Sequence, residues 1–163
     1  VATALHKVRV INANGDLSRF ESYGLPVIPD SLPDWPGPLA GILSCLDWLA
    51  QSHCECDLLL SCATDAPFIS SDLAFRLLQA RTAENATLAQ ARSSGRRHPV
   101  FGLWPVSIRQ DLRTALIEDG LRKIDDFTDR FSLAIADFAG HPDPFSNVNQ
   151  PDDIAAAEAY FDS

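Results

Sequence analysis

A short apolar run at residues 57–63, DLLLSCA, is the feature that most restricts the fold of this chain. A continuous apolar run of this length, followed directly by a turn, is typical of a strand buried on both faces of a mainly parallel sheet. The turn is Thr64-Asp65-Ala66-Pro67. The Asp65 carboxylate is therefore expected to project from the end of this strand into a crevice at the edge of the sheet.

Strands and helices alternate along the rest of the chain, joined by short connections. Apolar patterns predict further strands at residues 7–13, 27–28, 86–91, 99–104 and 133–137. They predict helices at residues 38–52, 70–82, 108–118, 122–131 and 152–161, and the end of another helix at residues 1–6. This alternation indicates a three-layer α/β/α sandwich, wound right-handed, whose ligands bind beyond the C-terminal ends of the strands.

Two of the expected helices carry clear signals. The helix at residues 38–52 has Pro38 in its first turn, where no amide hydrogen bond is lost, and apolar residues at helical spacing. The helix at residues 70–82 is expected to be capped by Ser70 or Ser71. Its inward-facing residues are expected to be Phe75, Leu77 and Leu78.

Size and charge narrow the classes of protein. With 163 residues, 46% of them hydrophobic, the chain can bury one substantial core, so residues 1–163 are expected to form a single domain. The net charge of −9 repels polyanions and argues against nucleic acid as a partner. The same net charge still allows a small phosphorylated ligand to bind, because nearby cations, backbone amides and a magnesium ion attract its phosphates at short range. No apolar run approaches the length of a membrane span, so we expect a cytoplasmic protein with no membrane partner.

Three strand ends carry polar side chains that suit a nucleotide-sized cleft. Magnesium prefers one or two carboxylates, with waters and substrate phosphates completing its octahedron, so Asp65 alone is a plausible ligand. Asp30 and Asn12 end two other expected strands in the same way. A helix cap or turn explains Asp65 without any ligand, and a turn is the commoner explanation of Asn12 or Asp30 taken alone, since Asn and Asp favour strand ends.

The segment Pro36-Gly37-Pro38-Leu39-Ala40-Gly41 leads into the helix at residues 38–52. Free amides and the positive end of that helix can hold a base carbonyl or a phosphate, and Gly37 and Gly41 allow a ligand to approach the backbone. A rigid loop with a close helix contact explains the same glycines without any ligand.

Further polar groups come from three other segments. Arg96, Arg97 and His98 are expected at a hairpin tip, and either a bound anion or ordinary surface charge explains the arginines. The pair Arg122-Lys123 has the same two explanations. Asn147 and Asn149 lie two apart, so in an extended segment both amides face one site; a turn that begins the last helix is the alternative.

Several segments together resemble the molybdenum cofactor guanylyltransferases, which are nucleotidyltransferases with a Rossmann-like fold. An Asp followed by a Gly-Pro-Leu-x-Gly loop, then Thr-Asp-x-Pro and Asn-x-Asn-x-Pro, is fairly specific for that family. The matching segments occur in the family's order and are VINAN (10–14), GLPVIPDSLPDWPGPLAGIL (24–43), LLLSCATDAPFISSDL (58–73), RRHPVFGLWP (96–105), GLRKIDDF (120–127) and FSNVNQPDDI (145–154).

The resemblance implies a role for each candidate residue. The GTP-binding positions that it implies are Asn12, Asp30, Gly37, Gly41 and Asp65. Asp65 would also be the magnesium ligand, and Asp65 and Asn149 would be the catalytic residues. Its positions for the molybdopterin or its phosphate are His98, Arg122, Lys123, Asn147 and Asn149. The reaction that it implies transfers GMP from GTP to the phosphate of molybdopterin. Molybdoenzymes or other cofactor-synthesis proteins are the macromolecular partners that it suggests.

The sequence departs from the family at its beginning. The family opens with a strand and a glycine-rich loop, LAGGxxxRMGGxDK, which holds the triphosphate, and no segment here matches that loop. The resemblance therefore implies a domain that is incomplete at its N-terminus, with its first strand missing. From the 163 residues alone we expect weak nucleotide binding and no turnover.

Three other functions fit parts of the pattern. A cytidylyltransferase or another nucleotidyltransferase of the same fold would share most of these residues. A non-catalytic module that only carries the cofactor would explain the unmatched loop. A phosphohydrolase with Asp65 as its nucleophile fits least well, because no second acidic residue adjoins Asp65.

Overall fold

The structure is a computed structural model that describes residues 8–32, 37–52 and 55–161. These residues belong to two compact units, Val1–Leu59 with Trp104–Ser132, and Leu60–Leu103 with Leu133–Ser163. The single-domain expectation stays a prediction. The helix end expected at residues 1–6 lies outside the described residues. No helix in the described ranges is long and apolar enough to cross a membrane.

The first unit contains two short parallel strands and several helices. Strand β1 (Ile11–Asn12) pairs with β2 (Val27–Ile28), and a 3₁₀ helix, η1 (Leu17–Tyr23), connects them. Four further helical segments follow in this unit, and they are α1 (Pro38–Gln51), η2 (Val106–Ile108), α3 (Arg109–Ile117) and α4 (Ile124–Thr128). The strand expected at residues 7–13 is thus limited to two residues in the described part.

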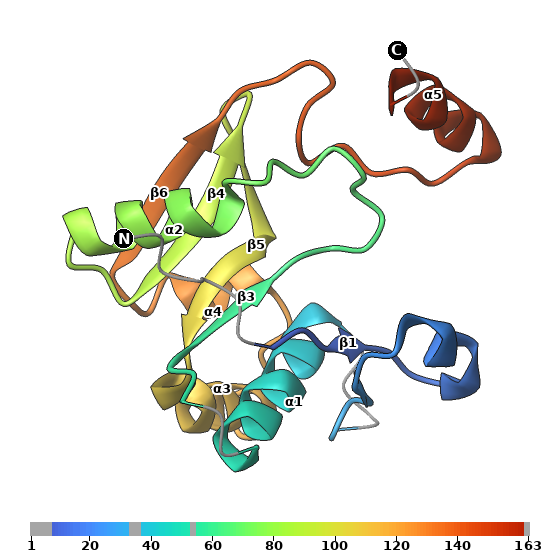
Figure 1. Cartoon of the computed structure of the whole chain (residues 1–163). Coiled ribbons are helices and arrows are strands. Elements are labelled where there is room, and N and C mark those ends of the chain that lie inside the picture. Colours follow the sequence, from blue (N-terminus) through green and yellow to red (C-terminus); the bar gives the residue numbers. More distant parts are fainter. Residues whose placement is uncertain (1–7, 33–36, 53–54, 162–163) are drawn as a thin grey trace. The chain divides into compact units, whose positions relative to one another are not determined.

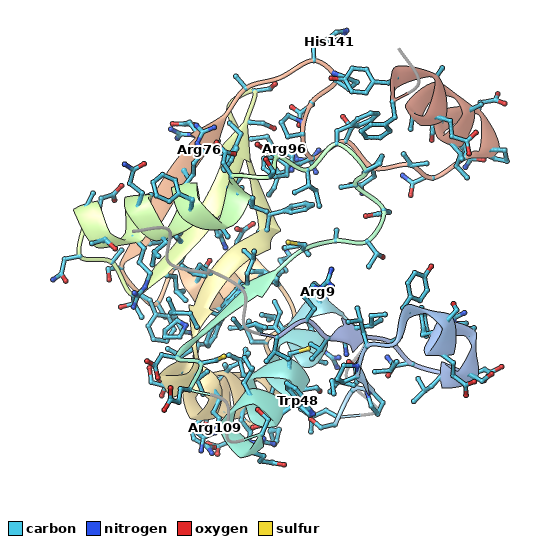
Figure 2. All side chains as sticks on the ribbon, viewed as in Figure 1. Arg9, Trp48, Arg76, Arg96, Arg109 and His141 are labelled. Carbon is cyan, nitrogen blue, oxygen red and sulfur yellow. The ribbon has the colours of Figure 1, made fainter. Side chains whose placement is uncertain are left out.

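Helix α1 forms the core of the first unit, as its pattern predicts. It begins at Pro38 and ends at Gln51, within one residue of the predicted bounds. Residues 39–46 are all buried, as is Leu49, so the first two turns of the helix are enclosed by the rest of the unit. The helix packs against α3, β1 and β2. At the α1–α3 contact, Asp47 of α1 binds the guanidinium groups of Arg109 and Arg113. Trp48 and Arg109 mark these two helices in Figure 2.

The second unit is built on a four-stranded sheet whose strand order is β3-β5-β4-β6. The strands are β3 (Leu58–Ser61), β4 (Leu88–Ser93), β5 (Arg96–Pro105) and β6 (Leu133–Phe138), of which β3 and β5 begin or end in the first unit. Strands β4 and β6 run parallel, with Ala89 opposite Ala134, whereas β4 and β5 are antiparallel. Helix α2 (Leu73–Ala83) packs against β4 and β6 (Figure 1), and α5 (Pro151–Phe161) ends the chain.

The hairpin between β4 and β5 confirms the predicted polar turn. Ser94 and Gly95 both have positive φ angles, 49° and 76°, and Ser93 pairs with Arg96 across the turn. Two consecutive positive φ angles define a type I′ turn, which matches the twist of the flanking strands and favours glycine. The turn places Ser93 and His98 on adjacent strands near the hairpin tip.

Two predictions about burial were wrong. All four residues of β3 are only half-buried, because β3 lies at one end of the strand order instead of between two strands. Phe75 is 57% exposed, while Leu73, Ala74 and Leu77 face the sheet. The helix starts at Leu73 and its N-cap is Asp72 rather than Ser70 or Ser71, so Phe75 falls on its outer face.

The helix predicted at residues 122–131 is also shorter than expected. It is confined to α4, Ile124–Thr128. After α4 the hydrogen bonds span three residues. The Arg130 amide donates to the Phe127 carbonyl, and the Phe131 amide donates to the Thr128 carbonyl. These are i→i+3 contacts, which end an α-helix. Arg122 therefore precedes the helix, and Lys123 is its N-cap residue.

Candidate functional site

Asn12, Asn14 and Asp30 form one hydrogen-bonded group at the ends of β1 and β2. The Asn12 amide nitrogen donates to Asp30 Oδ1 at 2.9 Å and to the Ile28 carbonyl at 2.9 Å. Asn14 Nδ2 donates to Asp30 Oδ2 at 2.8 Å, and its Oδ1 accepts from the Asp30 amide at 2.9 Å. Parallel pairing brings both strand ends to the same edge, so the sequence-based expectation that Asn12 and Asp30 lie together is met. We call Asn12, Asn14 and Asp30 the strand-end group.

Gly41 of α1 leaves room for the strand-end group. A Cβ atom at Gly41 would overlap the amide oxygen of Asn12 and lie 2.9 Å from its Cγ. Real Cβ atoms do not approach other atoms so closely, so only glycine fits here while Asn12 keeps its position. Gly37 serves a different purpose, because its φ of 133° lies in the region that favours glycine and it is the N-cap residue of α1.

Asp65 lies in the second unit, on the loop that follows β3. Its carbonyl oxygen accepts a hydrogen bond from the Val148 amide at 2.7 Å, which ties this loop to the segment before α5. Within the described ranges the Asp65 carboxylate makes no hydrogen bond of its own. Asp65 is half-buried and its carboxylate oxygens make no hydrogen bond with the described residues, so they are available to bind one magnesium ion whose other ligands are phosphates and water.

A cavity of 340 Å³ adjoins Asp65. Its walls come from Thr64, Asp65 and Pro67 on the loop, Val148, and four residues of α5. Glu158 of α5 adds a second carboxylate to these walls. No cluster of three or more His, Cys, Asp or Glu side chains with metal-binding geometry occurs among the residues that the structure describes, so a metal at Asp65 would depend on ligand oxygens.

Asn147 and Asn149 are both exposed and belong to the segment before α5. The backbone amides of Asn149 and Gln150 donate to Asp153 Oδ2 at 3.0 and 2.9 Å. These two bonds lower the pKa of Asp153, and they cap the start of α5. The helix-start interpretation raised from the sequence therefore accounts for the backbone at Asn149, while Asn147 lines a separate cavity.

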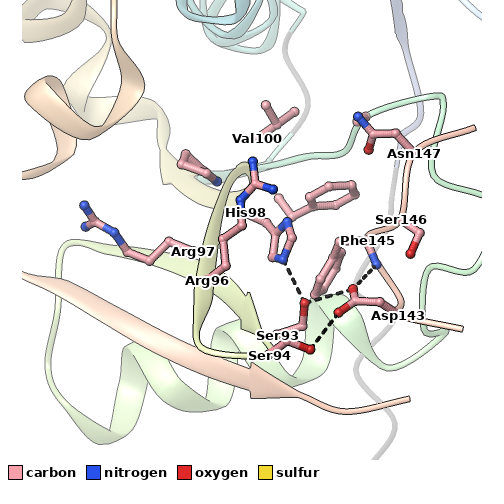
Figure 3. A pocket seen from close by; sticks show the side chains of 13 residues that line it. Ser93, Ser94, Arg96, Arg97, His98, Val100, Asp143, Phe145, Ser146 and Asn147 are labelled. Atoms are coloured by element: carbon pink, nitrogen blue, oxygen red, sulfur yellow. Dashed lines mark hydrogen bonds between the residues drawn. The ribbon is translucent and has the colours of Figure 1, made fainter. Parts of the chain in front are cut away.

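That larger cavity, of 610 Å³, lies at the tip of the β4–β5 hairpin (Figure 3). Ser93 Oγ lies 2.8 Å from Nε2 of His98 and donates to Asp143 Oδ1 at 2.8 Å. The same carboxylate accepts from Ser94 Oγ at 3.2 Å and from the Phe145 amide at 2.9 Å. The residues lining the cavity also include Arg96, Arg97, Phe101 and Asn147.

Charge within this cavity is set by its hydrogen bonds and its burial. Burial lowers the pKa of His98 below its ordinary value; Asp143 opposes this shift and Arg96 adds to it. Burial acts to raise the pKa of Asp143, but hydrogen bonds from the Phe145 amide, Ser93 and Ser94 outweigh it and hold that pKa low. Near neutral pH the cavity thus contains a carboxylate and an uncharged imidazole, with two arginines in its lining.

The predicted site residues divide between the two units. Asn12, Asp30, Gly37, Gly41, Arg122 and Lys123 belong to the first unit, whereas Asp65, His98, Asn147 and Asn149 belong to the second. Asn12 contacts both Asp30 and Gly41, and His98 and Asn147 line one cavity. That both sets serve a single active site stays a prediction.

Sequence reasoning did not identify Asn14, Ser93 or Asp143. Asn14 continues the polar end of β1, so the same strand-end argument could have included it. Ser93 and Asp143 are fifty positions apart and meet only because β4 and β6 pair in parallel register, with Ser93 opposite Phe138. No local pattern in the sequence indicates that meeting.

Comparison with known proteins links this geometry to one family. The family model described as the MobA-like NTP transferase domain matches residues 1–131. A molybdenum cofactor guanylyltransferase of Rhodopseudomonas palustris (strain BisB5) is 50% identical over 149 residues, which are 91% of this chain and 71% of that protein. One from Nitrobacter hamburgensis is 49% identical over 150 residues, 91% of this chain and 72% of that protein.

The fold has a counterpart among solved structures. The crystal structure of molybdopterin-guanine dinucleotide biosynthesis protein A from Archaeoglobus fulgidus superimposes with a TM-score of 0.69 at 21% sequence identity. The match covers 94% of this chain and 78% of that one, and it confirms the predicted Rossmann-like α/β fold. The matches in sequence and in fold together establish that the chain belongs to the MobA-like NTP transferase family, among the molybdenum cofactor guanylyltransferases.

Proposed function

We propose that this protein transfers GMP from GTP to the terminal phosphate of molybdopterin, giving the guanine dinucleotide cofactor and pyrophosphate. The observation that carries the proposal is that Asn12 lies against Gly41 and is hydrogen-bonded to Asp30, in a chain half-identical to a guanylyltransferase. A glycine that is required by the position of a neighbouring side chain indicates that the position itself matters. We assign the strand-end group and the start of α1, Gly37 included, to the nucleoside of GTP.

The reaction forms one bond and breaks one. An oxygen of the molybdopterin phosphate attacks the α-phosphorus of GTP, and the bond between that phosphorus and the oxygen bridging to the β-phosphate breaks. Pyrophosphate leaves with the bonding electron pair. The nucleophile is already ionised at neutral pH, so no general base is needed, and catalysis depends on positioning and charge neutralisation.

Asp65 would hold a magnesium ion through its unengaged carboxylate, with the phosphates and water as the remaining ligands. The ion would neutralise charge on the transferring and leaving phosphates. The Val148 amide holds the backbone of Asp65 through its carbonyl oxygen. Asn149 would assist in the same region.

The acceptor substrate would occupy the 610 Å³ cavity beside His98 and Asn147. That cavity combines aromatic rings, hydrogen-bonding groups and arginines, which suits a pterin that carries a phosphate. Arg122 and Lys123, both exposed at the start of α4, would contact phosphates.

We propose the cytoplasm, where GTP is available, as the location, with no nucleic acid or membrane partner. Molybdoenzymes or other cofactor-synthesis proteins would receive the product.

Nucleotide preference separates this proposal from a cytidylyltransferase of the same fold. We expect saturating GTP with magnesium to raise the melting temperature of the complete gene product by about 5–10 °C, since a ligand at one hundred times its Kd stabilises by about 2.7 kcal/mol. CTP at the same concentration should raise it by clearly less. Equal shifts, or a larger shift with CTP, would support the cytidylyltransferase instead.

A further inference from the structure

Three side chains at the β4–β5 hairpin are joined in a row by hydrogen bonds. Ser93 ends β4, His98 lies on β5, and Asp143 follows β6. Ser93 stands between the other two, 2.8 Å from Nε2 of His98 and 2.8 Å from Oδ1 of Asp143. Figure 3 shows this row at one wall of the cavity. The arrangement determines where the protons are.

The proton positions follow from the donors available. Asp143 is ionised near neutral pH, so its carboxylate can only accept, and it does so from Ser93, Ser94 and the Phe145 amide. The hydroxyl of Ser93 has one hydrogen, which is therefore committed to Asp143. Ser93 can then only accept from the imidazole, so Nε2 of His98 must carry a hydrogen.

Burial protects this arrangement from water. Ser93 is 2% exposed, so solvent does not compete for its hydrogen bonds. The imidazole ring lies 4.7 Å from the ring of Phe145 and 6.3 Å from that of Phe101, centroid to centroid. Low exposure favours the uncharged ring, and the charged groups around it are Asp143, Arg96 and Arg97. An uncharged ring with hydrogen on Nε2 has a lone pair on Nδ1.

We propose that Ser93 and Asp143 are positioning residues that hold His98 as its Nε2–H tautomer, so that Nδ1 accepts a hydrogen bond from a ring N–H or amino group of the pterin. In the described ranges Nδ1 makes no hydrogen bond within the protein, and His98 lines the cavity. A pterin has such donors on its pyrimidine ring and a flat face suited to Phe101 and Phe145. The inference deepens the proposed function and rests on it for the identity of the ligand.

The tautomer can be read without any substrate. Nitrogen NMR of selectively labelled histidine distinguishes a ring nitrogen that carries hydrogen from one that does not. We expect the unprotonated signal at Nδ1 of His98 at pH 7.5 in the unmodified protein. Hydrogen on Nδ1 instead, or a doubly protonated ring at that pH, would overturn the inference.

Binding of a simple pterin tests the acceptor role. Hydroxymethylpterin should shift the Nδ1 signal, and Ser93→Ala should weaken its binding about tenfold, the usual worth of one well-placed hydrogen bond. Ser71→Ala is the matched control, because Ser71 is an exposed serine of the same unit that does not line the cavity, and this variant should bind the pterin normally. An unmoved Nδ1 signal, or equal binding by the two variants, would contradict the proposed contact.

The pH dependence follows from the same proton. Protonation of Nδ1 removes its lone pair, so pterin affinity should be complete above the pKa of His98 and fall as pH drops through it. That pKa lies below the ordinary histidine value.

In the transfer assay Ser93→Ala should raise the KM for molybdopterin about tenfold and leave kcat and the KM for GTP unchanged. Loss of transfer in the unmodified protein would refute the proposed function, whereas the NMR results decide the tautomer separately.

Discussion

Asp65→Asn is expected to lower the rate of GMP transfer by roughly 10²–10³-fold or more, because it would remove the proposed anionic ligand of a magnesium ion that neutralises the reacting phosphates. The fold should survive the change. Asp65 contributes its backbone carbonyl, not its carboxylate, to the hydrogen bond with Val148. The free energy of unfolding should therefore stay within about 0.5 kcal/mol of the unmodified protein. Pyrophosphate release measures the rate, and chemical denaturation measures the stability.

The control for this variant is Glu84→Gln. Glu84 is an exposed carboxylate at the end of α2 in the same unit, so the substitution changes the charge equally without touching the cavity beside Asp65. It should transfer GMP at the unmodified rate. If Asp65→Asn turns over at a rate close to that of Glu84→Gln, the proposed catalytic role of Asp65 is wrong.

Gly41→Ala is expected to produce the second large effect, a loss of GTP affinity of about tenfold or more together with a stability cost of about 1–3 kcal/mol. The added methyl group would occupy the space of the Asn12 amide. Asn12 would have to leave Asp30 and the Ile28 carbonyl, and so disturb the strand-end group. Isothermal titration with GTP measures the first effect, and chemical denaturation measures the second.

A double-mutant cycle shows whether the effect passes through Asn12. In an Asn12→Ala background the clash is absent, so the further change Gly41→Ala should cost little in stability and no additional GTP affinity. Asn12→Ala alone should weaken GTP binding, because it removes a proposed contact with the nucleoside. Independent, additive effects of the two substitutions would mean that Gly41 matters for another reason.

The parts of the site that sequence could predict are those set by local pattern. Pro38 and the apolar spacing after it identify α1, and polar residues after short apolar strands identify Asn12 and Asp30 as neighbours. Both inferences depend only on residues close in the sequence and on the rule that parallel strand ends share an edge. The structure agrees with both.

The parts that failed depend on the position of an element in the whole sheet. The apolar run at residues 57–63 looks like a central strand, yet β3 is an end strand with half-buried side chains. Phe75 suits a buried face by its chemistry, but the start of α2 at Leu73 turns it outward. The row Ser93–His98–Asp143 requires the pairing of β4 with both β5 and β6, which no single segment encodes.

The transfer reaction itself is the most direct test of the central claim. The complete gene product would be incubated with magnesium, molybdopterin and equal concentrations of GTP and CTP, and the products would be separated and identified by mass. We predict the guanine dinucleotide of molybdopterin, with one pyrophosphate released for each molecule formed. A cytosine dinucleotide as the main product, or GTP consumed without any dinucleotide, would contradict the assignment of this protein as a guanylyltransferase.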